Sequence, residues 1–356
     1  MKPVYLVGRA LACTLGNSLD TALERLHSPV APAQTPASGV SEGTLPYQRI
    51  SGNATEGGWD ARARSLIADV AQAAGAAQAH AGALFIAMSC QDGDAAEKMQ
   101  RDMDFHALSG RIGEWLDWRG PVYLCSTACT SGIQALLGAC DWLQAGLGTE
   151  ALVLGVELDN RLTLPGFEAL QLLSSTGSKP LGLHRDGLVL GEAVAALRLS
   201  SGCEAPWKLL GGANVVDGVQ PTTASADAVT QMCRVALANC GLEATEVDLI
   251  KVQAAGSPVN DAAEAEGLRA AFAPVPALVS LKPLLGHCMG ASGVAEIALL
   301  LECLEKGHWP RYPERADPAL EVQLAQQAPA NLRRILASIL GFGGSHAAVV
   351  LERSAV

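Results

Sequence analysis

The chain reads Val122-Tyr123-Leu124-Cys125-Ser126-Thr127-Ala128-Cys129-Thr130-Ser131-Gly132, a short apolar strand followed by a turn and the start of a helix. The helix is expected over Gly132–Leu143, because its apolar residues are spaced three and four apart. Cys129 then lies at a helix N-terminus, where free N–H groups and the helix dipole lower a thiol pKa from about 8.5. Cys129 is a candidate nucleophile, although a cysteine near a helix start is more often a packing residue.

Strand–helix units of this kind recur along the chain. Apolar strands that alternate with helices are typical of parallel sheets covered on both faces, which predicts the α/β class. The expected strands are Val4–Val7, Ala83–Met88, Val122–Leu124, Ala151–Val156, Leu188–Leu197, Trp207–Val216, Leu249–Val252, Ala277–Ser280, Arg334–Ser338 and Ala347–Glu352. The expected helices are Ser18–Leu26, Gly132–Leu143, Ala226–Cys240, Asp261–Phe272 and Gly293–Lys306.

Polar residues, Pro and Gly mark loops at Ala31–Thr55 and His308–Asn331 and a junction at Ser200–Pro206. A length of 356 residues is enough for about two domains. The junction predicts two halves, residues 1–200 and residues 201–356, each with its own strand–helix units.

The amino-acid composition and net charge of the chain disfavour several classes of function. Apolar residues make up 49% and charged residues 17%, as in a globular chain. The net charge of −11 disfavours nucleic acid as a partner. No apolar run reaches the length of about 18 residues that a membrane helix needs, and the start lacks a signal peptide, so we expect no membrane span and a cytoplasmic location. The ten cysteines show no zinc spacing, which predicts reduced thiols and no metal site.

Two further glycine-rich turns carry candidate site residues. Lys282–Gly293 follows a strand and opens a helix, and it places His287 in a turn that leaves room for a substrate. Gly341-Phe342-Gly343-Gly344-Ser345-His346 precedes the last strand. Consecutive glycines allow backbone amides to converge as an oxyanion hole requires, and Phe342 could gate or line an apolar tunnel.

Taken in order, the motifs resemble those of the β-ketoacyl synthase (ketosynthase) family of the thiolase superfamily. The resemblance covers most of the chain and rests on Ser126–Gly132, Gly155–Glu157, Pro165–Ser174, Arg185–Ala193, Val252–Asp261, Lys282–Gly293 and Gly341–Ser345. It implies a thiolase-like fold, in which two related halves form an αβαβα five-layer sandwich. It also implies a dimer formed through a strand near the nucleophile, and decarboxylative Claisen condensation of acyl and malonyl groups. Both groups would be carried on the phosphopantetheine of an acyl carrier protein, and the chain itself would hold no cofactor.

The resemblance also implies roles for single residues. Cys129 matches the acyl-accepting nucleophile, and His287 matches one of two histidines that hydrogen-bond the malonyl carbonyl. Lys282 matches the lysine that organises the site, and Glu192 its acidic partner. Phe342 matches the gate. The remaining expected substrate-binding residues are Phe167, Gly343 and Gly344.

The chain departs from the family pattern at the other histidine. The family reads His-Gly-Thr-Gly-Thr-Pro-x-Asn-Asp, whereas this chain reads Gln253-Ala254-Ala255-Gly256-Ser257-Pro258-Val259-Asn260-Asp261. Pro258, Asn260 and Asp261 fix the register, so Gln253 occupies the place of the histidine. A neutral carboxamide can donate an N–H but cannot act as a base or carry a positive charge. Ser345-His346 in place of Thr-Asn is a milder change.

Three functional hypotheses follow. The first is a subunit similar to the chain-length factors of type II polyketide synthases, which pairs with an active ketosynthase. Gln253 and a shortened N-terminal half favour it, Cys129 speaks against simple equivalence, and small ketosynthase-like proteins of aryl polyene clusters are the nearest resemblance. The second is an independently active condensing enzyme, a homodimer in which Gln253 replaces the histidine. The third, a cysteine hydrolase using Cys129 and His287, fits the residue types but not the ordered motifs.

Overall fold

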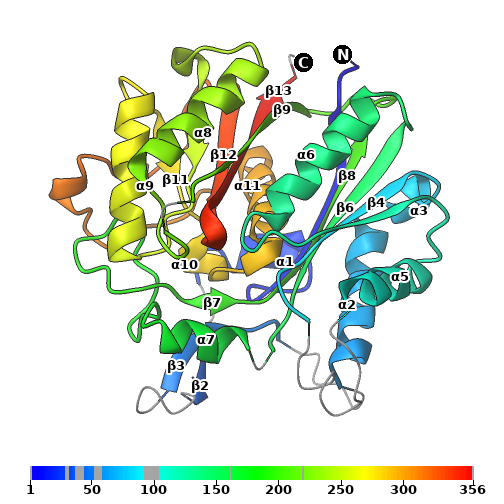
Figure 1. Ribbon diagram of the computed structural model, residues 1–356, viewed down its shortest axis with the longest axis horizontal. Coiled ribbons are helices and arrows are strands. Elements are labelled where there is room, and N and C mark those ends of the chain that lie inside the picture. Colours follow the sequence, from blue (N-terminus) through cyan, green and yellow to red (C-terminus); the bar gives the residue numbers. More distant parts are fainter. Residues whose placement is uncertain are drawn as a thin grey trace.

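The computed structural model describes residues 2–28, 32–36, 44–51, 58–91, 104–160, 162–218 and 220–354 (Figure 1). The strands are β1 Tyr5–Cys13, β2 Ala33–Pro36, β3 Thr44–Gln48, β4 Ala83–Ala87, β5 Val122–Cys125, β6 Glu150–Glu157, β7 Leu190–Gly191, β8 Ala193–Ser200, β9 Trp207–Val216, β10 Leu249–Lys251, β11 Ala277–Val279, β12 Arg334–Leu340 and β13 Ser345–Arg353. The α-helices are α1 Leu19–Glu24, α2 Gly58–Ala73, α3 Ala76–Ala79, α5 Phe105–Trp115, α6 Ser131–Gln144, α7 Thr163–Ala169, α8 Ala226–Asn239, α9 Pro258–Ala271, α10 Lys282–Leu285 and α11 Ser292–Lys306. Short 3₁₀ turns occupy Ala244–Glu246, Met289–Ala291, Pro318–Leu320 and Phe342–Gly344.

Ten strands form one sheet in the order β11-β10-β12-β13-β9-β1-β8-β6-β4-β5. Its two sets of five strands have the same topology. In one set β5, β4 and β6 are parallel to one another, β8 is antiparallel to β6, and β1 is antiparallel to β8. In the other set β11, β10 and β12 are parallel to one another, β13 is antiparallel to β12, and β9 is antiparallel to β13. The sets meet where β1 pairs with β9 at Tyr5 and Lys208.

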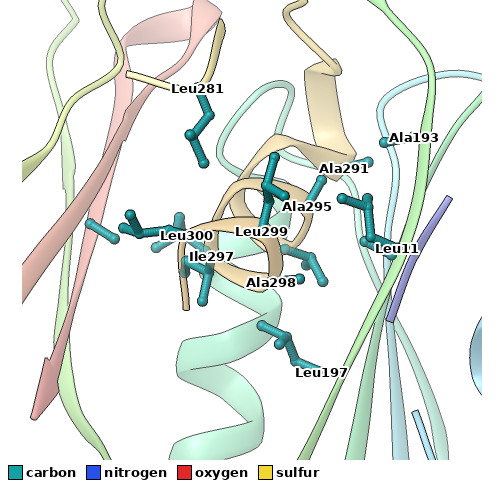
Figure 2. Close-up of a cluster of buried hydrophobic side chains, with 14 of the residues drawn as sticks. Leu11, Ala193, Leu197, Leu281, Ala291, Ala295, Ile297, Ala298, Leu299 and Leu300 are labelled. Atoms are coloured by element: carbon teal, nitrogen blue, oxygen red, sulfur yellow. The ribbon is translucent and has the colours of Figure 1, made fainter. Parts of the chain in front are cut away.

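The helices and the two strand sets form five layers. Helices α6 and α11 lie between the sets and contact strands of both, whereas α2 and α5 cover one outer face and α8 and α9 the other (Figure 1). Each interface has its own apolar core, and the largest core surrounds α6 and α11. Figure 2 shows Leu299 and Leu300 of α11 inside this central core, with Leu197 of β8 on the side of the helix that carries Ala298. The predicted α/β class and layer order are confirmed.

Two element predictions need correction. The loop expected over Ala31–Thr55 contains β2 and β3, while residues 31, 37–43 and 52–55 lie outside the described part of the chain. Residues 45–48 of β3 are buried without alternation, and Pro46 within them resembles a loop signal, so the sequence shows no period-two strand pattern there. The strand expected over Leu188–Leu197 is interrupted at Glu192, because β7 pairs with β3 and β8 pairs with β1 and β6.

Two further observations concern the length and apolarity of the helices and the state of the cysteines. Within the described ranges, no helix is both long enough and apolar enough to cross a lipid bilayer. None of the ten cysteines forms a disulfide with another described cysteine, and six of them, including Cys129, are buried.

Candidate active site

The site forms where the N-termini of α6 and α11 meet. A Cβ atom on Gly132 would lie 3.0 Å from the backbone nitrogen of Val294, and one on Gly293 would lie 2.8 Å from the backbone nitrogen of Ile133. A larger residue at either glycine would push the two backbones apart, so glycine allows this close approach. The turn that precedes α6 therefore faces the turn that precedes α11.

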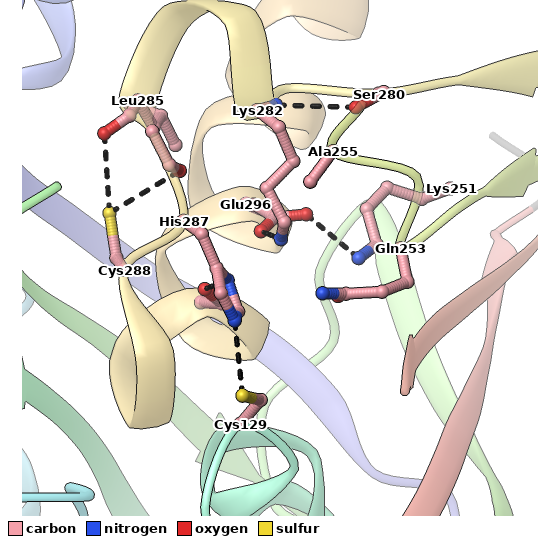
Figure 3. A network of polar contacts seen from close by, with 12 residues as sticks. Cys129, Lys251, Gln253, Ala255, Ser280, Lys282, Leu285, His287, Cys288 and Glu296 are labelled. Atoms are coloured by element: carbon pink, nitrogen blue, oxygen red, sulfur yellow. Dashed lines mark hydrogen bonds and ion pairs between the residues drawn. The ribbon is translucent and has the colours of Figure 1, made fainter. Parts of the chain in front are cut away.

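Cys129 and His287 project from these two turns towards each other. The Sγ atom of Cys129 lies 3.0 Å from Nε2 of His287, and Nδ1 of His287 lies 3.1 Å from Oγ of Ser292 (Figure 3). Both side chains are buried, with only 2% exposed. Ala128 has φ 52°, a left-handed conformation that is uncommon for alanine and sharpens the turn directly before the thiol. With the Nδ1 proton donated to Ser292, Nε2 can accept the proton of the thiol.

Burial keeps both groups of this pair neutral. It raises the pKa of the Cys129 thiol to about 11, although the N–H of Phe342 and the charge of Lys282 lower it in part. Burial, together with the charges of Lys282 and Lys251, holds the pKa of His287 well below its ordinary value. The expectation of a lowered thiol pKa at the helix start is wrong, because loss of water around the sulfur outweighs the favourable N–H groups.

The glycine turn at residues 341–344 places a second backbone amide at the sulfur. The N–H groups of Phe342 and of Cys129 itself both contact Sγ. Two amides that converge on this point can stabilise an oxyanion on an acyl group bound there. Gly343 and Gly344 both have φ 76°, Gly343 donates its N–H to the carbonyl of Pro221, and a Cβ on Gly344 would overlap the carbonyl of Asp217. These two glycines shape the turn and are not among the residues that line the cavity, so their expected substrate contact stays a prediction.

Lys282 is buried behind His287, and its acidic partner is Glu296 on α11. The same carboxylate accepts a hydrogen bond from Lys251 on β10 at 2.8 Å, so one glutamate joins two lysines (Figure 3). Lys251 also donates to the carbonyl of Ser338 at 2.7 Å. Both lysine side chains are fully buried, and the two cations hold the pKa of Glu296 below its ordinary value despite burial. The cluster adds positive charge beside His287.

The expected pairing of Lys282 with Glu192 is wrong. Glu192 forms an ion pair with Arg62 at 2.5 Å and accepts the backbone N–H groups of Ile50 and Asp159, each at 2.8 Å. The reason is its position at the break between β7 and β8, where its side chain faces α2. Glu192 therefore ties together segments of the N-terminal half and lies outside the cavity of Cys129.

Gln253 follows β10 and lines the same cavity as Cys129 and His287. Its side chain is 8% exposed and extends towards His287 (Figure 3). The backbone N–H donates to Glu264 at 2.7 Å, while the carboxamide oxygen is buried without a hydrogen-bond partner. Glu264 lines the cavity as well, and burial raises its pKa to about 7.

No second imidazole replaces the missing one within the described residues. His287 is the histidine that contacts Cys129 there. His346 is buried beside the glycine turn, but it does not line the cavity and neither ring nitrogen has a hydrogen-bond partner. The site therefore holds one imidazole and one carboxamide.

Phe342 and Phe167 form a stacked pair in the lining of the cavity. Their rings stack with centroids 5.2 Å apart and an angle of 12° between the planes, and both line the cavity beside Cys129. The cavity volume is about 40 Å³, enough for little more than water. The space beside Cys129 must therefore enlarge before it can hold an acyl chain, and the expected gate role of Phe342 stays a prediction.

Sequence reasoning missed Glu296, Lys251 and Ser292. Glu296 could have been noticed, because it is the one charge in the apolar run Val294–Leu301. A charge on the buried face of a helix needs a buried partner. Lys251 and Ser292 carry no comparable signal, since their role appears only when β10 and α11 are brought together.

Matches to two protein-family models show which family the chain belongs to. Residues 55–205 match "Beta-ketoacyl synthase, N-terminal domain", and residues 210–314 match "Beta-ketoacyl synthase, C-terminal domain". Together they span more than half of the chain. The chain belongs to the β-ketoacyl synthase family.

The curated relatives of this ketosynthase-family chain are much longer. It is 29% identical over 300 residues to polyketide synthase-nonribosomal peptide synthetase TwmB of Talaromyces wortmannii. This match covers 71% of this chain and 10% of that protein. It is 31% identical over 287 residues to polyketide synthase ThaG of Burkholderia thailandensis, which covers 69% of this chain and 5% of that protein. The chain thus spans a tenth or less of these relatives.

Solved structures similar to this ketosynthase-family chain match it along nearly its whole length. A ketosynthase (ApeO) in complex with its chain length factor (ApeC) from Xenorhabdus doucetiae matches at a TM-score of 0.84 and 20% identity, covering 99% of this chain and 98% of that one. The ishigamide ketosynthase/chain length factor matches at a TM-score of 0.84 and 21% identity, and the match covers 99% of this chain and 100% of that one. A β-ketoacyl synthase from Burkholderia phymatum matches at 0.84 and 20%, covering all of both chains. These likenesses confirm the predicted thiolase-like fold.

Proposed function

We propose that this chain is a ketosynthase-like subunit that accepts an acyl group on Cys129 and assists a complete ketosynthase in decarboxylative Claisen condensation. The substrates would be acyl and malonyl thioesters of a carrier protein in a type II fatty acid or polyketide system, and the chain would hold no cofactor of its own. The observation that carries the proposal is Gln253, which lies where a second imidazole is needed, beside an intact pair of Cys129 and His287.

The geometry supports the acyl-transfer half of the reaction. As the sulfur of Cys129 attacks the thioester carbonyl, its proton passes to Nε2 of His287. The oxyanion is stabilised by the N–H groups of Cys129 and Phe342. When the tetrahedral intermediate collapses, the carbon–sulfur bond to the carrier breaks and the leaving thiolate takes the proton from His287. Because the His287 pKa is low, the imidazole is unprotonated and ready to accept.

The decarboxylation half of the reaction should be slower than in a site with two histidines. Loss of CO₂ from the malonyl thioester leaves an enolate, whose carbon attacks the acyl-Cys129 thioester while the thiolate of Cys129 departs. The enolate oxygen needs two positioned donors, which here are the neutral carboxamide of Gln253 and His287 in the tautomer that carries its proton on Nε2 and accepts the Ser292 hydroxyl through Nδ1. Loss of one good oxyanion donor typically slows a reaction by about 10² to 10³. Condensation by the lone chain should therefore be slow.

Among the described residues, no strand pairs with the outer edge of β5, which supports association with a partner subunit. β5 is the outermost strand of the ten-stranded sheet, and Tyr123 on it is 42% exposed. Pro121 and Cys125 accept hydrogen bonds from β4, so the backbone groups of the alternate residues Val122 and Leu124 point outward. We propose that this edge pairs with β5 of a complete ketosynthase. Two similar structures are described as complexes of a ketosynthase with its chain length factor.

The intact pair of Cys129 and His287 favours a second candidate, an independently active condensing homodimer in which Gln253 serves as the second donor. Both candidates need acyl transfer to Cys129 and differ in what the chain does alone.

Purified chain, with and without a ketosynthase that carries a complete Cys-His-His set, is supplied with acyl-carrier and malonyl-carrier. We expect an acyl adduct on Cys129 by intact-protein mass spectrometry, and condensation product only with the partner. Condensation by the lone chain at the rate of the pair would remove the partner-subunit proposal in favour of the homodimer. If the matched variant Cys129→Ala, itself free of adduct, gave the complex an unchanged rate, Cys129 would have no part in the reaction.

A further inference from the structure

A second cavity lies on the other side of the turn that carries Lys282. Its volume is about 690 Å³, within the range of roughly 300–1,000 Å³ that is usual for small-molecule sites. Its walls are apolar and include Leu181, Pro283, Leu284, Tyr312 and Leu324. It shares no lining residue with the cavity of Cys129, so it is a separate space.

The rim of this second cavity is positively charged. Lys179, Arg311 and Arg315 line it, against the one carboxylate of Glu314. Glu314 is engaged by His184, whose ring Nδ1 lies 2.9 Å away. Among the described residues, neither Arg311 nor Arg315 forms an ion pair, and both are exposed. On a chain of net charge −11, two unpaired guanidinium groups beside an apolar wall favour an anion with an apolar body.

The wall of the second cavity is hydrogen-bonded to the backbone next to the active site. The hydroxyl of Tyr312 donates to the carbonyl of Ser280 at 2.9 Å and accepts its N–H at 3.1 Å. The Ser280 hydroxyl donates to the carbonyl of Ala254, the neighbour of Gln253, at 2.8 Å. Pro283 and Leu284 follow Lys282 directly. An occupant would therefore press on the segments that position Gln253 and His287.

We propose that this second cavity binds a small amphipathic anion, a carboxylate with an aliphatic or aromatic body. The apolar body would lie against Leu284, Tyr312 and Leu324, and the carboxylate would accept hydrogen bonds from Arg311. This binding does not depend on any condensing activity of the chain.

Calorimetric titration of the folded parent protein with decanoate tests the site, and substitutions in the second cavity distinguish binding there from binding near Cys129. We expect decanoate to bind and decyltrimethylammonium, with the same chain length and opposite charge, not to bind. Arg311→Gln removes one charge-assisted contact and should weaken decanoate binding about tenfold. Gln323→Trp fills the cavity from an exposed position and should abolish binding. Arg119→Gln, an exposed arginine of the N-terminal half, is the matched control and should change nothing.

Thermal melting of each variant verifies that it is folded before it is titrated. Equal binding of the anionic and cationic probes, or decanoate binding that both Arg311→Gln and Gln323→Trp leave unchanged, would overturn the proposal. So would absence of decanoate binding to the folded parent protein.

Discussion

At the residue scale, the reactivity of Cys129 is set by the position of one proton. A thiolate beside an imidazolium would react equally fast over a broad pH range, whereas a neutral pair depends on pH. The structure gives the neutral pair, because burial raises the pKa of the Cys129 thiol to about 11 and lowers that of His287.

We therefore predict that alkylation of Cys129 by iodoacetamide rises with pH between 7 and 9.5. The thiolate is the reactive form, and below a raised pKa its fraction grows about tenfold for each pH unit. Peptide mass spectrometry of Cys129 at several pH values measures the rate. A rate that stays constant from pH 7 to 9 would instead indicate a preformed ion pair.

Which single residues could be predicted depended on how local their signal was. Cys129, His287 and Phe342 each lie in a glycine-containing or helix-opening turn after a strand, and the structure brings all three to one cavity. Lys282 was assigned the wrong carboxylate, Glu192, because the sequence does not show that α11 turns Glu296 towards Lys282. The raised thiol pKa was missed because depth of burial is a property of the assembled layers.

At the element scale, the contact between α6 and α11 decides the geometry of the site. Gly293 lies against the backbone of Gly132 and Ile133, where a side chain has no room. Gly110, inside α5, has nothing within 4 Å of the position that its Cβ would take.

We predict that Gly293→Ala destabilises the protein and slows acylation of Cys129, because a methyl group against backbone must push the two helices apart. The destabilisation should be about 1–3 kcal/mol. Gly110→Ala is the matched control, and it should stabilise α5 by about 0.5–1 kcal/mol. Urea unfolding gives both free energies, and equal effects of the two substitutions would contradict the close packing.

A second element-scale prediction concerns the charge cluster of α11. Glu296→Gln leaves Lys251 and Lys282 buried without a counter-charge, which costs about 3–5 kcal/mol of unfolding free energy. Glu305→Gln on the same helix is the control. It weakens a more exposed ion pair with Arg9 and should cost at most about 1 kcal/mol. Chemical denaturation compares them, and a mild effect of Glu296→Gln would mean that the lysines are neutral.

At the scale of the whole molecule, the proposed partner adds to the sheet at the outer edge of β5, which no other strand of the described ranges covers. We predict that Tyr123→Lys prevents association, because a charged side chain on an edge strand opposes strand pairing. Val259→Lys is the control, since Val259 is also exposed but belongs to α9 of the other half. Light scattering after size exclusion, with and without the complete ketosynthase, gives the masses. Loss of the complex with both variants, or with neither, would argue against this edge.

The overall architecture was predictable because strand–helix alternation and apolar periodicity are repeated over the chain. The strand at Trp207–Val216 was placed at its observed ends, and α8 and α11 were placed within one residue at each end. Segments whose order depends on distant contacts were not predictable. β3 is held by β2 and β7, and its Pro46 resembles a loop signal until those neighbours are known.

The most direct test of the account is the rate of CO₂ release from malonyl-carrier by the parent protein and by Gln253→His. The account predicts that restoring the imidazole raises this rate by about 10² to 10³, while acylation of Cys129 stays unchanged. A parent protein that already releases CO₂ as fast as the Gln253→His variant would contradict the claim that the carboxamide limits the reaction.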